Sequence, residues 1–222
     1  MQRLYKQFIP THYQITWDLT KANERTITGS VTITGEQKNA EHIVLHAKDL
    51  IISRLTVNDI EAPFTHGDDD ELTIAHTGSG EVTIAAEFSL ALTDSMHGIY
   101  PCFYEVNGEK NELYATQFES HHAREAFPCI DEPEAKATFD VTLTTTPGIT
   151  VLGNQPVKWQ REKDEKLVTT FETTPRMSSY LLAWVVGEMH RKTATTKDGV
   201  EVNVWATPAQ RPESLDFALD HA

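Results

Sequence analysis

Apolar and polar residues alternate along most of the chain with a period of two, the pattern of a half-buried β-strand. Tyr13, Ile15 and Trp17 alternate with polar residues, and Val82 and Ile84 begin a second such stretch that runs to residue 88. The same reasoning predicts further strands at residues 26–33, 43–47, 50–57, 72–75, 138–145, 149–152, 167–171, 180–186 and 200–206.

Turn-forming residues separate these apolar stretches, at Asn58-Asp59, Gly67-Asp68, Gly78 to Gly80, Asn107-Gly108, Gly153-Asn154 and Asp198-Gly199. Short strands spaced by such turns favour an antiparallel sandwich or saddle over βαβ units. The predicted fold class is therefore all-β. The run YLLAWVVGE, residues 180–188, is apolar on both faces, which predicts a central strand covered on both sides.

Helix-forming patterns are few. Ser120 is a candidate N-cap for one short helix near residues 120–127, which Pro128 would end. Near the C-terminus, Pro208 and Pro212 indicate a linker, and an apolar helical pattern then begins and stops with the chain. We therefore expect a β domain over residues 1–207, and over residues 208–222 a linker with the truncated first helix of a following domain.

Composition narrows the classes of partner. The 222 residues include 33 acidic and 19 basic side chains, for a formal charge of −14. Such a charge disfavours binding to nucleic acid or anionic membranes. No apolar run is long enough to span a membrane, and the first residues lack the apolar core of a secretory signal. The two cysteines, far apart in sequence, are expected to be free thiols in a cytoplasmic protein.

One cluster of residues invites a metal-site interpretation. His121, His122 and Glu125 are close in sequence, but Ala126 follows Glu125, so the inverted-zincin motif H-x-x-E-H is not formed. Adjacent histidines on a helix are also expected to point to different sides. Solvent-facing helix residues are the favoured interpretation, and no metal is predicted to bind this chain.

Gln117 and Glu119 form a different kind of pattern. In a strand, residues two apart project to the same side, so Phe118 between them should point into the core. A carboxylate and an amide on one face at a strand end can recognise an ammonium group. Their spacing alone is equally compatible with ordinary surface polarity.

Several segments, in order along essentially the whole chain, resemble the amino-terminal part of the aminopeptidase N family of gluzincin aminopeptidases. These segments are MHGIYPCFYEVNG, TQFES followed by HHAREAFPCIDEPEAKATFDVTL, RMSSYLLAWVVGE and PESLDFALDHA. The resemblance implies a saddle-shaped, all-β first domain packed on a thermolysin-like catalytic domain. It also implies an enzyme that removes single amino acids from peptide N-termini with a zinc ion, held by two histidines and a glutamate, that activates water.

The resemblance assigns a role to the strand-end pair. Gln117 and Glu119 match family positions that line the pocket for the first residue of the substrate, and Glu119 would help to hold its α-ammonium group. The family's G-A-M-E-N and H-E-x-x-H segments have no counterpart in this sequence. We therefore expect the zinc in the full-length protein, no catalytic zinc in this chain, and no turnover by this chain alone. The implied partners are peptides with a free N-terminus and the protein's own catalytic domain.

Two alternatives remain at this stage. The chain could be a non-catalytic β-sandwich that binds sugars or another protein, which predicts an exposed aromatic platform. It could also be a purely architectural domain that touches no substrate. Independently of these alternatives, Arg124, Asp131 and Glu132 are predicted to form local ion pairs that fix a turn.

Overall fold

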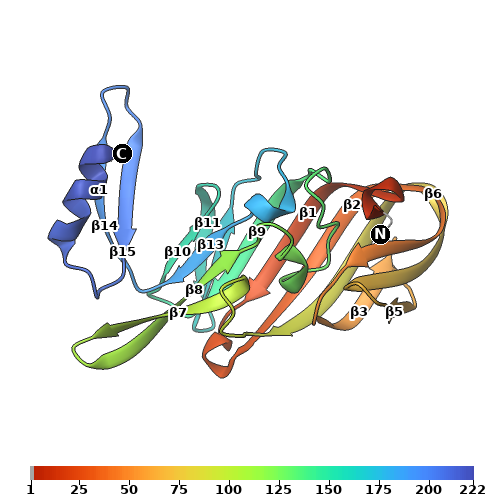
Figure 1. Cartoon of the computed structure of the whole chain (residues 1–222), viewed down its shortest axis with the longest axis horizontal. Coiled ribbons are helices and arrows are strands. Elements are labelled where there is room, and N and C mark those ends of the chain that lie inside the picture. The colour runs from red at the N-terminus through yellow and green to blue at the C-terminus, as the bar shows by residue number, and fades with distance from the viewer. Residues whose placement is uncertain (1–2) are drawn as a thin grey trace.

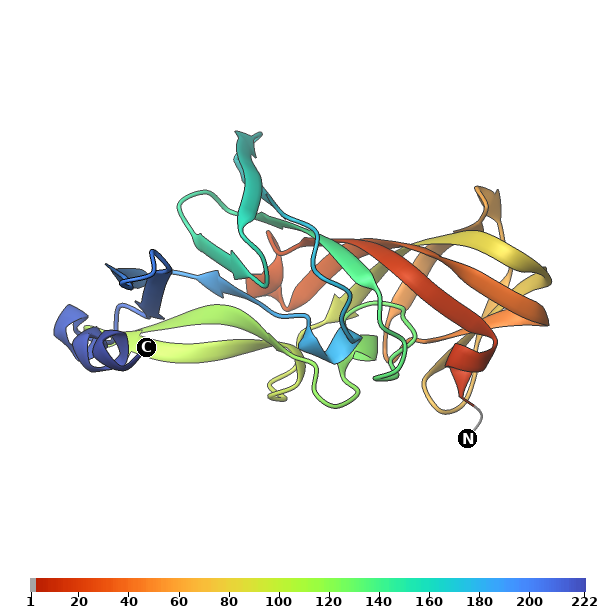
Figure 2. The ribbon, with the colours of Figure 1, turned by 90° about the horizontal axis from the view of Figure 1, so that it is seen from above.

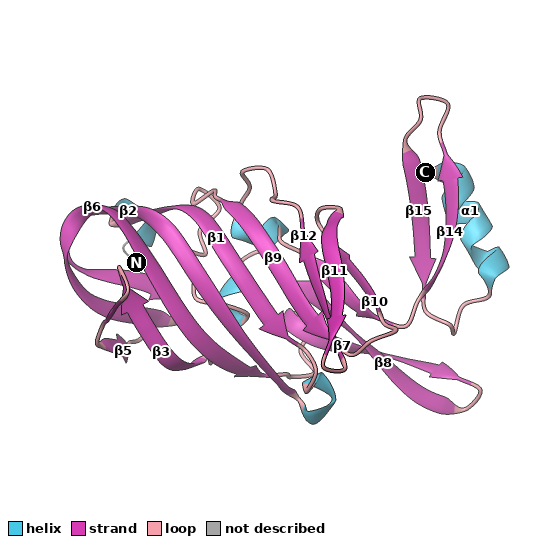
Figure 3. Ribbon diagram, turned by 180° about the vertical axis from the view of Figure 1, so that it is seen from behind, coloured by secondary structure: helices cyan, strands magenta, loops and turns pink. Residues whose placement is uncertain are grey.

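The computed structural model describes residues 3–222, and most of them lie in three β-sheets (Figures 1 and 3). The largest sheet has nine strands in the order β11-β12-β9-β1-β2-β6-β3-β4, with β5 also paired to β6. Its strands are β1 (Phe8–Asp18), β2 (Thr26–His46), β3 (Ile51–Val57), β4 (Ile60–Glu61), β5 (Phe64–His66), β6 (Glu71–Ala91), β9 (Thr138–Thr145), β11 (Val157–Lys163) and β12 (Lys166–Phe171). The predicted all-β class is confirmed.

A four-stranded sheet, in the order β10-β13-β8-β7, supplies the second layer. Its members are β7 (Gly98–Val106), β8 (Glu109–Gln117), β10 (Thr150–Gly153) and β13 (Trp184–Gly187). In the view from above, the β7–β8 hairpin runs along one side of the large sheet and extends toward the C-terminal end (Figure 2). Short 3-10 helices lie between strands, at Leu4–Lys6, Ala22–Glu24, Ala123–Glu125, Ser179–Leu181 and Pro212–Ser214.

The core lies between these two layers. The alternating pattern of β1 places Tyr13, Ile15 and Trp17 on one buried face. Trp17 of the large sheet packs against Trp184 of the four-stranded sheet, with ring centroids 5.8 Å apart. Aromatic contacts of this kind add specific geometry to the free energy gained from burial, so they fix how the layers meet.

The two longest strands differ from the sequence prediction. The glycines at positions 78–80 indicated a turn, but β6 continues through them and pairs with β2 on both sides. Gly80 takes a φ of +102°, which glycine adopts without steric cost, and the β2–β6 register shifts beyond Gln37. Glycine and positive φ therefore mark an irregularity in a continuous ladder here, and the predicted turn is wrong.

Two further differences concern the strand pattern. One pair in the otherwise antiparallel large sheet, β1 with β9, is parallel. The predicted strand at 180–186 is only half correct, because Ser179–Leu181 is a 3-10 helix and the strand begins at Trp184. Leu181 is 49% exposed, so the apolar run is not covered on both sides throughout. Its strand part, β13, is central in its sheet, as predicted.

The C-terminal segment stands apart from the two main sheets (Figure 1). Strands β14 (His190–Thr195) and β15 (Glu201–Ala206) form a hairpin, and helix α1 (Leu215–His221) packs against both. A helix is therefore present where the apolar pattern predicted one. Within residues 3–222, no helix is both long enough and apolar enough to cross a membrane.

Candidate functional site

The segment after β8 turns sharply and contains less helix than predicted. It forms one 3-10 turn, Ala123–Glu125, with His122 at the N-cap position and no side-chain cap. The prediction that Ser120 is the N-cap is wrong, because His122 holds that position and the Ser120 hydroxyl group lies 2.7 Å from Nδ1 of His121. Pro128, which was predicted to end the helix, is buried just beyond this turn, which already ends at Glu125.

Gln117 and Glu119 lie at the end of β8 and are both exposed, whereas Phe118 between them is 1% exposed. The alternation expected from the sequence is therefore present. Gln117 pairs with Gly98 at the start of β7, which places the pair at the rim of the four-stranded sheet. Within residues 3–222, neither side chain has a hydrogen-bond or ion-pair partner. Both remain available to a ligand.

The far end of the same segment is anchored by a buried carboxylate. Asp131 accepts hydrogen bonds from the Arg124 backbone N–H and Nε, each at 3.2 Å, and from the Ser179 hydroxyl at 2.9 Å. Its own N–H donates to Nδ1 of His46 at 3.1 Å. Burial, and then the nearby Arg124 charge, lower the pKa of His46 to about 4, so this imidazole is a neutral acceptor at neutral pH.

The predicted ion pairs are only partly local. Arg124 and Asp131 form the expected pair, with a distance of 3.2 Å from Nε to Oδ2. Glu132 instead reaches the N-terminus, where its carboxylate accepts from the Leu4 N–H at 2.7 Å and pairs with Arg3 at 3.4 Å. The Arg124–Asp131 pair fixes the turn locally, and the contacts of Glu132 tie it to the N-terminal segment.

Two side chains of β1 hold the middle of the segment. Trp17 Nε1 donates to the carbonyl of Ala126 at 2.9 Å, and the Tyr13 hydroxyl accepts from the N–H of Ile130 at 3.2 Å. Both aromatic rings are fully buried. Gln117 and Glu119 are therefore followed by a segment that two side chains of the large sheet hold in place by hydrogen bonds.

A cluster of ionisable groups lies beside the strand-end pair. The Glu125 carboxylate contacts His97 Nδ1 at 2.6 Å, His122 Nδ1 at 3.0 Å and Lys48 Nζ at 3.0 Å. Burial raises the pKa of Glu125, but the hydrogen bonds from His122, Lys48 and His97 and the Lys48 charge outweigh it and hold the pKa below its usual value. Glu125 is therefore an anion at neutral pH.

The expectation that His121 and His122 point to different sides is wrong. Their rings stack with centroids 4.7 Å apart, because the segment here is a turn and not a regular helix. His122 also stacks on His97, with centroids 4.2 Å apart. No local sequence pattern links His97 to Glu125, because the two residues are 28 positions apart and come near each other through the pairing of β7 with β8.

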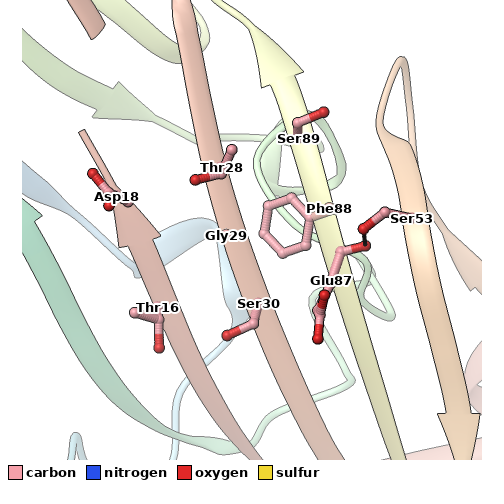
Figure 4. A pocket seen from close by; sticks show the side chains of 9 residues that line it. All are labelled: Thr16, Asp18, Thr28, Gly29, Ser30, Ser53, Glu87, Phe88 and Ser89. Atoms are coloured by element: carbon pink, nitrogen blue, oxygen red, sulfur yellow. Dashed lines mark hydrogen bonds between the residues drawn. The ribbon is translucent and has the colours of Figure 1, made fainter. Parts of the chain in front are cut away.

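A shallow hollow of about 580 Å³ lies on the outer face of the large sheet (Figure 4). Its rim carries small polar side chains of β1, β2, β3 and β6, together with Asp18 and Glu87. The only aromatic residue lining it is Phe88, which is 3% exposed and so offers no stacking platform. The hollow lacks the feature that the sugar-binding alternative predicts.

A two-layer, open β-sandwich with a polar pair at the rim of one sheet and an anchored turn behind it defines the class of this domain. A family model described as the Peptidase M1 N-terminal domain matches residues 9–181, and the chain belongs to this family.

Comparison with individual proteins agrees. The chain is 50% identical over 99% of its length to an aminopeptidase N of Lactococcus lactis subsp. lactis, and 46% identical over all of it to one of Lactobacillus delbrueckii subsp. lactis. It is 36% identical over 95% of its length to a puromycin-sensitive aminopeptidase of Caenorhabditis elegans. The chain spans about a quarter of the length of these curated relatives, 26%, 26% and 24% respectively.

Proposed function

We propose that this chain is the N-terminal domain of a zinc-dependent aminopeptidase that removes single residues from the N-termini of peptides. In this proposal, Gln117 and Glu119 contact the first residue of the substrate. The observation that carries the assignment is that the side chains of Gln117 and Glu119 are both exposed at the end of β8, while Phe118 between them is buried.

The chemistry of the pair suits a peptide N-terminus. An α-ammonium group offers three N–H donors and a positive charge, which the Glu119 carboxylate can accept. The Gln117 amide adds a directional carbonyl acceptor. Because Glu119 has no ion-pair partner within residues 3–222, binding an ammonium group there breaks no existing contact. Such recognition would favour chain ends over internal peptide bonds.

The catalytic zinc belongs to the full-length protein in this proposal. The 222 residues contain no H-E-x-x-H, the motif of the family's catalytic zinc site, and we assign this chain no catalytic step. Residues 1–207 would form the β domain, and residues 208–222 the linker and first helix of the catalytic domain. Two free cysteines, Cys102 and Cys129, are compatible with the cytoplasmic location that we propose.

The test is the variant Glu119→Ala in the full-length aminopeptidase. Loss of a charged hydrogen bond should raise the transition-state free energy by roughly 1.5–3 kcal/mol, so that kcat/KM on amino-acid amides falls about 10- to 150-fold. Gln117→Ala should have a smaller effect and alter the preference for the first side chain. The 222-residue chain alone should show no turnover.

Glu109→Ala provides a matched control, because Glu109 is an exposed glutamate at the opposite end of β8. It should leave kcat/KM unchanged. If Glu119→Ala also leaves kcat/KM unchanged while the zinc content is normal, the domain has the architectural role and Glu119 does not bind substrate.

A further inference from the structure

The cluster around Glu125 combines groups that metals bind. His97, His122 and Glu125 each offer one donor atom, and these three atoms lie within 4.8 Å of one another. We propose that these three residues form a binding site for a divalent transition metal ion of the zinc class. The proposal departs from the expectation, based on the sequence, that no metal binds this chain and that His122 and Glu125 face solvent, because their side chains are only 22% and 15% exposed. It goes beyond the aminopeptidase assignment, and its test needs no catalytic activity.

The donor set selects the kind of ion. Two imidazole nitrogens and one carboxylate oxygen suit Zn²⁺, Co²⁺ and Ni²⁺, whereas Mg²⁺ and Ca²⁺ prefer sites made only of oxygen. Three protein ligands leave a fourth position for water, as in open zinc sites.

Both imidazole nitrogens already lie beside the Glu125 carboxylate, but the His97 and His122 rings stack at 24°, so one ring must turn for both nitrogens to face one ion. Nδ1 of His97 and of His122 lie 2.6 and 3.0 Å from the two oxygens of Glu125. Tetrahedral bonds of about 2.0–2.1 Å place neighbouring donor atoms roughly 3.3 Å apart. The two nitrogens would have to move away from the carboxylate by about 0.7 Å for His97 and about 0.3 Å for His122. Coordination through Nδ1 would require each neutral imidazole to carry its hydrogen on Nε2.

Strand pairing and hydrogen bonds hold the backbone around the three ligands. His97 precedes Gly98, which pairs with Gln117, and the His122 N–H donates to the carbonyl of Phe118 at 2.9 Å. Gly98 has a φ of +68°, and a Cβ added there would lie 2.9 Å from Oε2 of Glu125. Glycine thus allows the carboxylate to approach β7 closely, and both ligand segments are fixed to the same strand pair.

The three ligands are reachable from solvent, and the Lys48 ammonium group competes with a metal ion for Glu125. The side chains of His97, His122 and Glu125 are 39%, 22% and 15% exposed, and a pocket of about 200 Å³ lined by His97 and Glu125 opens beside them. Lys48 is the competing cation, with Nζ 3.0 Å from Oε1 of Glu125. Its side chain is 38% exposed and can turn into solvent, so the ion would displace it and Lys48 would weaken metal binding.

Calorimetric titration of the 222-residue chain, without a polyhistidine tag, with Zn²⁺ tests the proposal. We expect one Zn²⁺ per chain and a weakening of affinity by at least about tenfold in His97→Ala, His122→Ala and Glu125→Gln. Lys48→Gln should strengthen binding severalfold, an effect that a purely structural cluster would not produce. Co²⁺ should give visible absorption bands typical of low coordination number, and Mg²⁺ should not compete.

His12→Ala is the matched control, because His12 also pairs with a carboxylate, Asp140, at 3.3 Å and is partly buried. Its affinity for Zn²⁺ should equal that of the parent chain. Far-UV circular dichroism without metal verifies the fold of each variant, and His97→Gln replaces His97→Ala if the latter does not fold. The proposal is wrong if Zn²⁺ fails to bind at up to ~1 mM, a weak limit for a three-ligand zinc site, or if the His97 and His122 variants bind as tightly as His12→Ala.

Discussion

The segment of residues 118–131 has a carboxylate near each end, and the two carboxylates differ in exposure and in hydrogen bonding. Glu119 is exposed and has no polar partner within residues 3–222. Asp131 is 4% exposed and both of its oxygens accept hydrogen bonds. A buried charge is stable only when it is paired and hydrogen-bonded, whereas an exposed charge is solvated by water. Asp131 therefore anchors one end of the segment, whereas Glu119 at the other end is accessible to a ligand.

The largest effect should come from breaking the anchored end. Arg124→Ala leaves Asp131 without its cationic partner in the interior, and breaking a buried ion pair in this way costs about 3–5 kcal/mol. Chemical denaturation should show this loss in the free energy of unfolding. Arg54→Ala is the control, since Arg54 is exposed and lies 3.8 Å from Glu87, and should change stability by less than ~0.5 kcal/mol. Equal losses in the two variants would show that the buried Arg124–Asp131 pair stabilises the fold no more than a surface ion pair does.

A pH titration sharpens the same comparison. Folding lowers the pKa of His46 from 6.5 to about 4, because the imidazole is buried and faces Arg124. Between these values the unfolded chain binds a proton that the folded chain does not. Stability should therefore fall as the pH drops from 6.5 toward 4, by about 3 kcal/mol from this group. Below about pH 4 this contribution should stop growing.

The measurement compares His46→Asn with the parent chain, because many carboxylates titrate in the same range. Asparagine can still accept from the N–H of Asp131 but does not titrate, so the slope of unfolding free energy against pH should be smaller between pH 4 and 6.5. His66→Asn, at an exposed histidine of β5, should keep the parent slope. Parallel curves for His46→Asn and the parent would show that His46 titrates normally in the fold.

The sequence predicted most turns and the core-facing strands of the large sheet better than the exposed strands. Alternation located Thr138–Thr145 with the bounds of β9, because one face is buried against the core. It missed β11, all seven residues of which are exposed, so no apolar face marks it. The alternation of Gln117, Phe118 and Glu119 was also visible locally. No local pattern indicated the partners of Glu125, because Lys48 and His97 lie 77 and 28 residues away from it in sequence and come near only in the fold.

We expect the smallest change in stability from substituting Glu119, at the exposed end of the segment. Glu119→Gln keeps the shape of the side chain and removes only the charge, and Glu119 contacts no polar group within residues 3–222. The free energy of unfolding should therefore change by less than ~0.5 kcal/mol, the usual range for surface positions. Asp131→Asn, measured in the same denaturation series, should be far more costly because Arg124 loses its buried counter-ion. A loss above ~1 kcal/mol in Glu119→Gln would mean that this carboxylate supports the fold, since exposed charges contribute less. A near-zero loss would leave Glu119 free to act on a ligand, so that any fall in kcat/KM for its variants reports recognition and not a damaged domain.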